Sequence, residues 1–181
     1  MEKDDPVKEQ IRAFAKATGF EACGFASAAP LEVWRPFYRD RFFMDHVGAY
    51  IPYLEKNLEK RINPELLLPG VSTIIALLLP YAPKEVIPSE NNYIVSRYAY
   101  GSDYHTVIRK KLERVVCFLR HSFPGSTSRY FADSGGVKEK VWAQRCGVGW
   151  QGKNTLIIHR EKGSWFFIGI ILTTVPMDPD I

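Results

Sequence analysis

Hydrophobic residues recur with a helical period in some segments of this chain and form short continuous runs in others. Over residues 7–18, Ile11, Phe14 and Ala15 fall on one helical face, and Gly19 ends the pattern as a C-cap. A run of mostly small residues predicts a strand at 20–27, and short apolar runs predict further strands at 72–79, 93–98, 127–131, 155–159 and 164–172. The last two are joined by a charged turn containing Gly163, as in a hairpin.

The longest amphipathic segment follows Asp103, a residue type that often caps helix N-termini. Its apolar stripe predicts a helix packed on the core: Val107, Ile108, Leu112, Val115, Val116 and Leu119. The opposite face carries Arg109, Lys110, Lys111 and Arg114, and such a run of charge is usually a solvated surface. Further helices are predicted at residues 30–43, 49–58 and 137–146. Strands and helices interleave, which indicates an α/β or α+β fold with a central mixed sheet flanked by helices.

Composition narrows the class of protein. The 181 residues are 46% hydrophobic and 24% charged, which suits one domain over residues 1–181. No run reaches the roughly 20 apolar residues that span a bilayer, and the charged start of the chain does not resemble a signal peptide. Three widely spaced cysteines predict a reducing cytoplasm and offer no zinc or iron–sulfur motif, so no metal site is expected. The formal charge of +4 mildly favours a polyanionic partner.

The most specific segment reads D-S-G-G-V-K-E-K-V-W-A-Q-R-C-G-V-G-W-Q-G-K-N, from Asp133 to Asn154. Its glycines imitate a dinucleotide-binding loop, G-x-G-x-x-G, and, with Lys153, a P-loop. Both motifs place phosphate at the N-terminus of a helix that follows the loop. Here the predicted helix precedes the glycines and a strand follows them. A helix C-cap leading into a tight turn is therefore the better interpretation.

Asp133 follows a predicted strand, so we expect it at the rim of the sheet, where ligands commonly bind. It is a candidate proton donor, because an apolar site favours the protonated form of a carboxyl group. Candidate apolar walls are Tyr98, Trp142 and Trp150. An equally simple role for Asp133 is to cap the helix that begins near Val137. His105 lies in the first turn of a helix, where a structural role is more common than ligand binding, and contact with a bound cofactor is the alternative.

Several motifs together resemble the epoxyqueuosine reductase family, whose members complete queuosine synthesis in bacterial tRNA. The matching segments are R-I-N-P-E-L-L-L-P-G from Arg61 to Gly70, R-Y-A-Y-G-S-D-Y-H from Arg97 to His105, Asp133, G-V-G-W-Q-G-K-N-T from Gly147 to Thr155, and G-S-W-F-F-I-G from Gly163 to Gly169. They occur in the family's order and span most of the chain. Chance agreement is therefore a poor explanation.

This resemblance implies a cobalamin-binding domain with a flavin-reductase-like fold related to that of reductive dehalogenases. It also implies a ferredoxin-like domain with two [4Fe–4S] clusters after residue 181 of a full-length protein. Without that domain, the chain should bind cofactor but turn over little with a physiological electron donor. The implied partner is the tRNA anticodon stem-loop that carries the modified wobble base.

The family's residue roles map onto particular positions. Asp133 corresponds to the acid that protonates the epoxide oxygen. Lys140 and Lys153 correspond to tRNA contacts, although the family usually has arginine at the first position, and lysine lacks the bidentate fork of arginine. Gly136 also replaces the proline of the family's D-S-G-P. Cofactor contacts map onto Arg61, Tyr98, Ala99, His105, Gly152, Asn154, Thr155 and Ile157.

Two other functions stay open at this point. The same fold suits a corrinoid- or flavin-dependent reductase of another small substrate, which a bound flavin would favour. It also suits a non-enzymatic corrinoid carrier. Cysteine-rich motifs beyond residue 181 would separate the carrier from the reductase.

Overall fold

A computed structural model describes residues 5–36, 56–82, 96–133 and 136–180 of the chain. Its main sheet has the strand order β1-β2-β6-β3. Those strands are β1 (Ala22–Ser27), β2 (Thr73–Pro80), β3 (Ser128–Phe131) and β6 (Phe166–Thr173). A second, two-stranded sheet pairs β4 (Trp150–Gln151) with β5 (Ile157–Ile158). The helices are α1 (Pro6–Thr18), α4 (Leu58–Ile62), α5 (Tyr104–Ser122) and α6 (Glu139–Arg145), with 3-10 turns η2 (Pro64–Leu66) and η3 (Arg97–Ala99).

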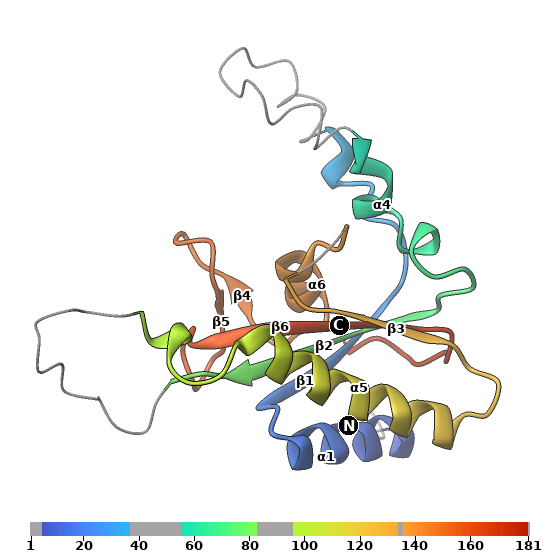
Figure 1. The fold of residues 1–181 in the computed structure, drawn as a ribbon. Helices are drawn as coiled ribbons and strands as arrows, with labels where there is room; N and C mark the ends of the chain where they lie inside the picture. The colour runs from blue at the N-terminus through green and yellow to red at the C-terminus, as the bar shows by residue number, and fades with distance from the viewer. Residues whose placement is uncertain (1–4, 37–55, 83–95, 134–135, 181) are drawn as a thin grey trace, which may run out of the picture.

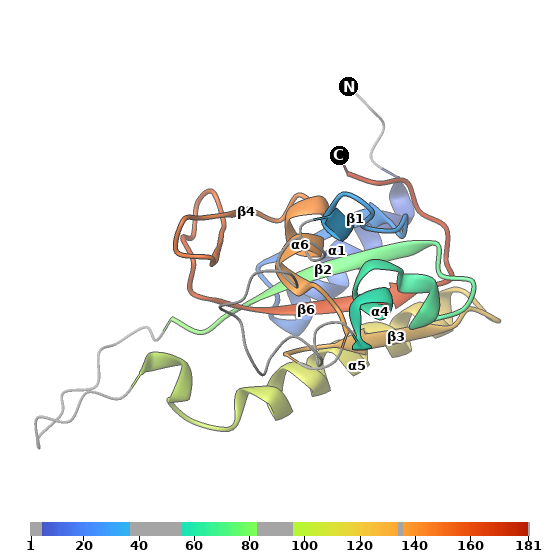
Figure 2. The ribbon, with the colours of Figure 1, turned by 90° about the horizontal axis from the view of Figure 1, so that it is seen from above.

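The sheet is covered on both faces. Figure 1 shows α1 and α5 on one side, and α4, α6 and the β4–β5 hairpin on the other. Along the sheet, α6 lies between the hairpin and α4, as Figure 2 also shows. Because both faces are covered, β2 is apolar at nearly every position and is buried from Thr73 to Leu79. Its residues alternate between the two core clusters: Ile75 and Leu77 face α1 and α5, whereas Ile74, Ala76 and Leu78 face α6.

The two long helices begin and end where the sequence predicts. The Asp5 carboxylate accepts a hydrogen bond from the Val7 amide, and α1 ends at Gly19, which has a φ of +101°. Asp103 caps α5 by accepting from the His105 amide at 3.0 Å. Of the cations predicted on the solvated face of α5, Lys111 instead donates to the carbonyl of Thr18. This bond ties α5 to the end of α1.

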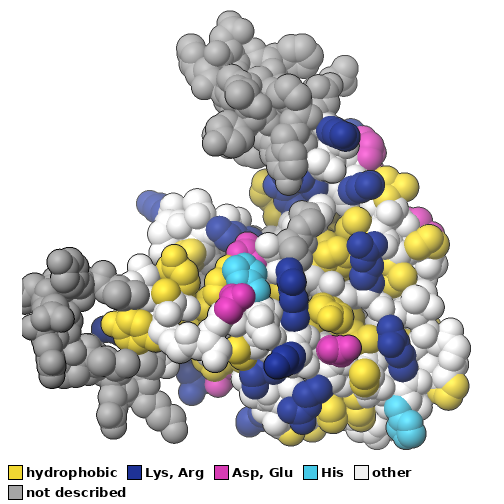
Figure 3. Space-filling model, in the orientation of Figure 1, with side chains coloured by type: hydrophobic (Ala, Val, Ile, Leu, Met, Phe, Trp, Pro, Cys, Tyr) yellow, Lys and Arg dark blue, Asp and Glu magenta, His cyan; other side chains and the backbone are white. Residues whose placement is uncertain are grey.

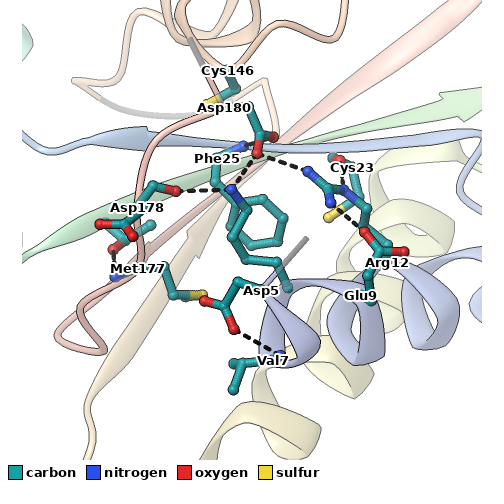
Figure 4. Close-up of polar contacts among 12 residues, drawn as sticks. Asp5, Val7, Glu9, Arg12, Cys23, Phe25, Cys146, Met177, Asp178 and Asp180 are labelled. Atoms are coloured by element: carbon teal, nitrogen blue, oxygen red, sulfur yellow. Dashed lines mark hydrogen bonds and ion pairs between the residues drawn. The ribbon is translucent and has the colours of Figure 1, made fainter. Parts of the chain in front are cut away.

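A short C-terminal segment returns along the edge strand β1. The Asp180 amide donates to the Phe25 carbonyl at 2.9 Å, and the Phe25 amide donates to Asp180 Oδ2 at 3.0 Å. Asp180 Oδ1 lies 2.5 Å from Lys8 Nζ and 2.7 Å from the Arg12 guanidinium. In Figure 4 the Asp180 carboxylate points at Arg12 and at the Phe25 backbone. The segment is therefore joined to both α1 and β1.

Several predicted features differ in the structure. The main sheet is antiparallel at every described pairing, not mixed. The predicted hairpin between 155–159 and 164–172 is wrong: β5 pairs with β4, and β6 pairs with β2 and β3. The long apolar run of β6 lies in the interior of the sheet. Both edges of β6 are therefore hydrogen-bonded, one to β2 and the other to β3. A single bridge, between His159 and Gly163, remains at the turn.

Other predicted elements lie partly outside the described residues. Within the predicted 93–98 strand, Arg97 instead begins the 3-10 turn η3, and residues 93–95 lie outside the described part. The predicted helix at 30–43 is helical at 34–36, and residues 37–43 lie outside. The predicted helix at 49–58 also falls almost wholly outside, since description resumes at residue 56.

Candidate active site at the start of helix α5

Asp133 lies just after β3 and meets the first turn of α5. The Tyr104 hydroxyl donates a hydrogen bond to Asp133 Oδ2. His105 Nε2 lies 3.6 Å from the same oxygen. The structure thus brings two sequence-predicted residues, Asp133 and His105, together with a third group, Tyr104, to which the sequence assigned no role of its own. A signal was available, because Tyr104 stands beside His105 in the R-Y-A-Y-G-S-D-Y-H motif.

Asp103 fixes the His105 ring from the other side. Its Oδ1 accepts from the His105 amide at 3.0 Å and lies 2.8 Å from His105 Nδ1. The hydrogen bonds from the His105 side chain and amide lower the pKa of Asp103, so this carboxylate stays ionised. The network therefore assigns the proton of the neutral imidazole to Nδ1. In that tautomer, the Nε2 lone pair is directed toward Asp133.

Aromatic contacts hold Tyr104 in place. Its ring stacks on Phe167 with centroids 4.2 Å apart and on His105 with centroids 3.9 Å apart. Tyr98 meets the Tyr104 ring edge-on at 6.3 Å. Burial raises the pKa of Tyr104, and the hydrogen bond to the Asp133 carboxylate raises it further. The phenol therefore keeps its proton at neutral pH and acts as a permanent donor to Asp133.

Asp133 does not cap a helix. The helix α6 begins at Glu139 with Lys138 at its N-cap, so the capping interpretation is wrong. Asp133 has a φ of +49°, a left-handed conformation uncommon outside glycine, and 64% of its side chain is exposed.

Among the predicted apolar walls, Tyr98 is exposed and touches the site through Tyr104, but Trp142 is buried in the core and cannot line it.

The glycine-rich segment has the predicted order of elements. The helix α6 runs into Gly147, which has a φ of +71°, and the short strands β4 and β5 follow. Because no helix begins after Gly152 in this described segment, neither nucleotide-binding motif is present. A Cβ atom on Gly149 would lie 2.5 Å from the Ile158 carbonyl oxygen, and one on Gly152 would lie 2.8 Å from Asn154 Oδ1. Close packing within the hairpin explains both glycines.

The remaining predicted residues fall into separate groups. Arg61 and Lys140 line one pocket of about 330 Å³ between α4, α6 and β4, with Lys138 and Gln151. Burial lowers the pKa of Lys138. The hairpin turn exposes Lys153, Asn154 and Thr155, and Asn154 Oδ1 accepts from the Leu156 amide at 3.2 Å. Ala99 follows Tyr98 in η3, and Ile157 is buried in the core, so its side chain is unavailable to a ligand.

Large hydrophobic side chains are exposed around this end of the sheet. Trp150 and Leu156 lie on the β4–β5 hairpin, Tyr98 on η3 and Trp165 before β6. The Arg97 guanidinium covers the Trp165 ring at 4.8 Å. Exposed apolar surface of this kind is typical of a binding site. The described residues contain no cluster of three or more histidine, cysteine or acidic side chains suited to a metal ion.

The fold is that of an α+β domain with an antiparallel sheet covered on both faces, and solved reductases contain the same domain. A catabolic reductive dehalogenase shares the fold over 98% of this chain and 21% of its own, with a TM-score of 0.61 and 15% identity. Two epoxyqueuosine reductase structures, each 28% identical, cover 97% of this chain and 47% of theirs with TM-scores of 0.79. One holds an epoxyqueuosine-modified tRNA-Tyr stem loop. The other, from Bacillus subtilis, has its catalytic aspartate loop swung out of the active site.

Sequence comparison identifies the family. A family model described as epoxyqueuosine reductase QueG, DUF1730, matches residues 61–134. An epoxyqueuosine reductase from Leadbetterella byssophila is 34% identical over 172 residues, covering 95% of this chain and 56% of the relative. The chain belongs to the epoxyqueuosine reductase family, and it spans about half the length of the curated relatives it matches. In the part of the chain described here, no helix has both the length and the apolar character to cross a membrane.

Proposed function

We propose that this chain is the cofactor-binding catalytic domain of an epoxyqueuosine reductase, which removes the epoxide oxygen from the modified wobble base of tRNA. The observation that carries the proposal is Asp133, an exposed acid held by Tyr104 beside His105. Opening an epoxide places negative charge on the departing oxygen, and a positioned acid typically accelerates such a step by about 10²–10⁴-fold. Relatives with a catalytic aspartate loop and with a bound epoxyqueuosine stem loop support the assignment.

We propose cobalamin as the cofactor, because this chain exposes the types of side chain that such a cofactor needs. A corrin is a broad flat ring with amide side chains, so it needs an apolar surface bordered by hydrogen-bonding groups. The β4–β5 hairpin exposes Trp150 and Leu156 next to the amide of Asn154 and the hydroxyl of Thr155. Tyr98 and His105 border the acid. Bound there, cobalamin would supply the electrons for epoxide reduction.

We place the electron donor and part of the tRNA contact surface in the half of the relatives that this chain does not span. The donor is proposed to be a ferredoxin-like domain with two [4Fe–4S] clusters. Within this chain, Lys140 and Lys153 remain the proposed contacts to the tRNA backbone, one beside the α6 pocket and one exposed on the hairpin turn. A cytoplasmic location follows from the tRNA substrate.

Replacing Asp133 tests the proposed function. In the complete protein loaded with cobalamin, Asp133→Asn should lower the rate of epoxyqueuosine reduction at least about 100-fold, because the amide cannot donate an acidic proton. The visible spectrum of bound cobalamin should be unchanged. Glu113→Gln, which removes an exposed carboxylate from α5, is the matched control and should reduce epoxyqueuosine at the wild-type rate. Full turnover by Asp133→Asn, or purification of the protein with bound flavin instead of cobalamin, would contradict the proposal.

A further inference from the structure

Removing an epoxide oxygen requires more protons than one carboxyl group carries. Converting the epoxide to an alkene and water consumes two electrons and two protons, the electrons coming from a low-potential corrinoid reductant under the proposed function. The first proton goes to the oxygen as one C–O bond breaks, and the second goes to the resulting hydroxyl as it leaves as water. Asp133 holds one proton at a time, so it must be protonated again within each turnover.

Among the groups around Asp133 that the structure describes, one is a suitable proton source. Tyr104 is a poor source, because its pKa is raised and its hydroxyl is a fixed donor to Oδ2. His105 Nε2 is directed at that oxygen from 3.6 Å, and the ring is 38% exposed, so solvent can protonate it. Histidine gains and loses a proton near neutral pH more readily than any other ordinary side chain.

We infer that His105, held by Asp103, returns a proton from solvent to Asp133 during the reaction; this inference rests on the proposed function. The imidazolium transfers its Nε2 proton to Asp133 Oδ2, while the Nδ1 proton stays in the hydrogen bond to Asp103. His105 then takes a new proton from water. His105 is thus a positioning and proton-transfer residue that acts through Asp133.

The geometry also separates the two oxygens of Asp133. Tyr104 and His105 both approach Oδ2, and Oδ1 has no hydrogen bond to any described residue. Rotation about the Cβ–Cγ bond, which is soft for aspartate, can carry the newly protonated oxygen toward the substrate. The exposure of the Asp133 side chain leaves room for that rotation. A separation of 3.6 Å is long for a direct transfer, and catalytic hydrogen bonds commonly shorten once substrate is bound.

Among the described residues, few other charged or titratable groups influence the His105 ring. Asp103 and Asp133 approach its two nitrogens, Tyr104 stacks on it, and Arg109 lies close enough to affect Asp103. Asp103 therefore orients the ring at Nδ1, and Asp133 lies at Nε2, the nitrogen that would exchange the proton. The arrangement resembles an acid–histidine pair in which one carboxylate orients the ring and the other side exchanges the proton.

The activity test compares His105→Gln with His121→Gln, a matched change near the other end of α5. In the complete cobalamin-loaded protein, His105→Gln should reduce epoxyqueuosine roughly 10- to 100-fold more slowly, and added imidazole should restore part of the rate. The pH profile of the wild-type rate should differ from that of the variant, because only the wild type has a side chain at position 105 that can exchange a proton. The control's rate should be unchanged.

A second measurement needs neither cofactor nor turnover. Nitrogen NMR of this chain with ¹⁵N-labelled histidine should show neutral His105 protonated on Nδ1, and Asp103→Asn should remove that preference.

If wild-type protein is active and His105→Gln is equally active with the same pH profile, the inference is wrong while the proposed function stands. If His105→Gln loses cobalamin and imidazole restores nothing, His105 serves the cofactor and the inference again fails. If wild-type protein does not reduce epoxyqueuosine, the proposed function fails, whatever the tautomer.

Discussion

Asp133 and Asp180 are both hydrogen-bonded aspartates, yet their surroundings give them different properties. Asp180 is 18% exposed and meets two cations and a backbone amide, so its carboxylate is fixed in one position. Asp133 is 64% exposed and meets a phenol and an imidazole, both at Oδ2, while Oδ1 has no hydrogen bond to a described residue. An acid that must give up a proton and be protonated again needs the second kind of environment. At the scale of the residue, exposure and partner type separate the structural carboxylate from the reactive one.

The environment of Asp180 predicts a pH-dependent contribution to stability. Burial opposes its ionisation, but hydrogen bonds from Lys8, Arg12 and the Phe25 amide outweigh burial and lower its pKa. A carboxyl group whose pKa is lower in the folded state stabilises that state above its unfolded pKa, about 3.9, and loses the contribution as pH falls further. Asp180→Asn should therefore lower the free energy of unfolding by about 2 kcal/mol at pH 7.

Urea unfolding at several pH values measures this effect. The difference between wild type and Asp180→Asn should stay constant from pH 7 to pH 5 and narrow below about pH 4. Asp178→Asn is the control, because that side chain is exposed, and its difference should stay near zero throughout. A difference for Asp180→Asn that persists unchanged at low pH would show that its carboxylate is not the stabilising group.

At the scale of the element, the segment from α6 to β5 is shaped by its own packing. Gly147 ends the helix with a positive φ, and Gly149 allows the hairpin to fold onto the Ile158 carbonyl. This packing places Asn154 and Thr155 at an exposed turn. The glycines therefore set the position of the hairpin whether or not a cofactor is bound.

Gly149→Ala tests whether packing or cofactor binding requires the glycine. The added methyl group would meet the Ile158 carbonyl at 2.5 Å and the Ile157 side chain at 2.9 Å. We expect the cofactor-free variant to lose about 1–3 kcal/mol of unfolding free energy, as for other overpacked sites. Gly125→Ala is the comparison, since its φ of +87° adds strain but no atom lies within 4 Å. An unchanged cofactor-free stability with weakened cobalamin binding would instead assign the glycine to the cofactor.

At the scale of the whole molecule, the features that the sequence predicted correctly are those that depend on the local pattern of residues. The caps of α1 and α5, the buried strand β2 and the order of helix, glycines and strand each depend on neighbouring residues. The pairing of β5 with β4 and the hydrogen bond from Tyr104 to Asp133 depend on tertiary contact, the latter across 29 positions. Periodicity carries no information about such pairs, so the hydrogen bond that gives Tyr104 its role could be found only in the folded chain.

The distribution of charge over the molecule leads to a prediction about the proposed tRNA substrate. Figure 3 shows lysine and arginine side chains spread over the face where α5 lies in Figure 1, next to acidic and histidine side chains. On α5, Arg109, Lys110 and Arg114 are exposed, and none of them forms an ion pair with another described residue. Exposed cations of this kind can bind backbone phosphates, which supply much of the affinity of a protein for nucleic acid.

If this face contacts the tRNA backbone, Arg109→Gln/Arg114→Gln should weaken binding of an anticodon stem-loop roughly tenfold. The slope of log affinity against log salt should also fall by about 1.5, because two phosphate contacts are lost. Arg160→Gln/Lys162→Gln removes the same charge from the turn before Gly163 and is the control for net charge. Fluorescence anisotropy at several salt concentrations measures both quantities. Equal losses of stem-loop affinity in the two double variants would attribute the effect to net charge. An unchanged slope of log affinity against log salt in the α5 variant would exclude this face from tRNA contact.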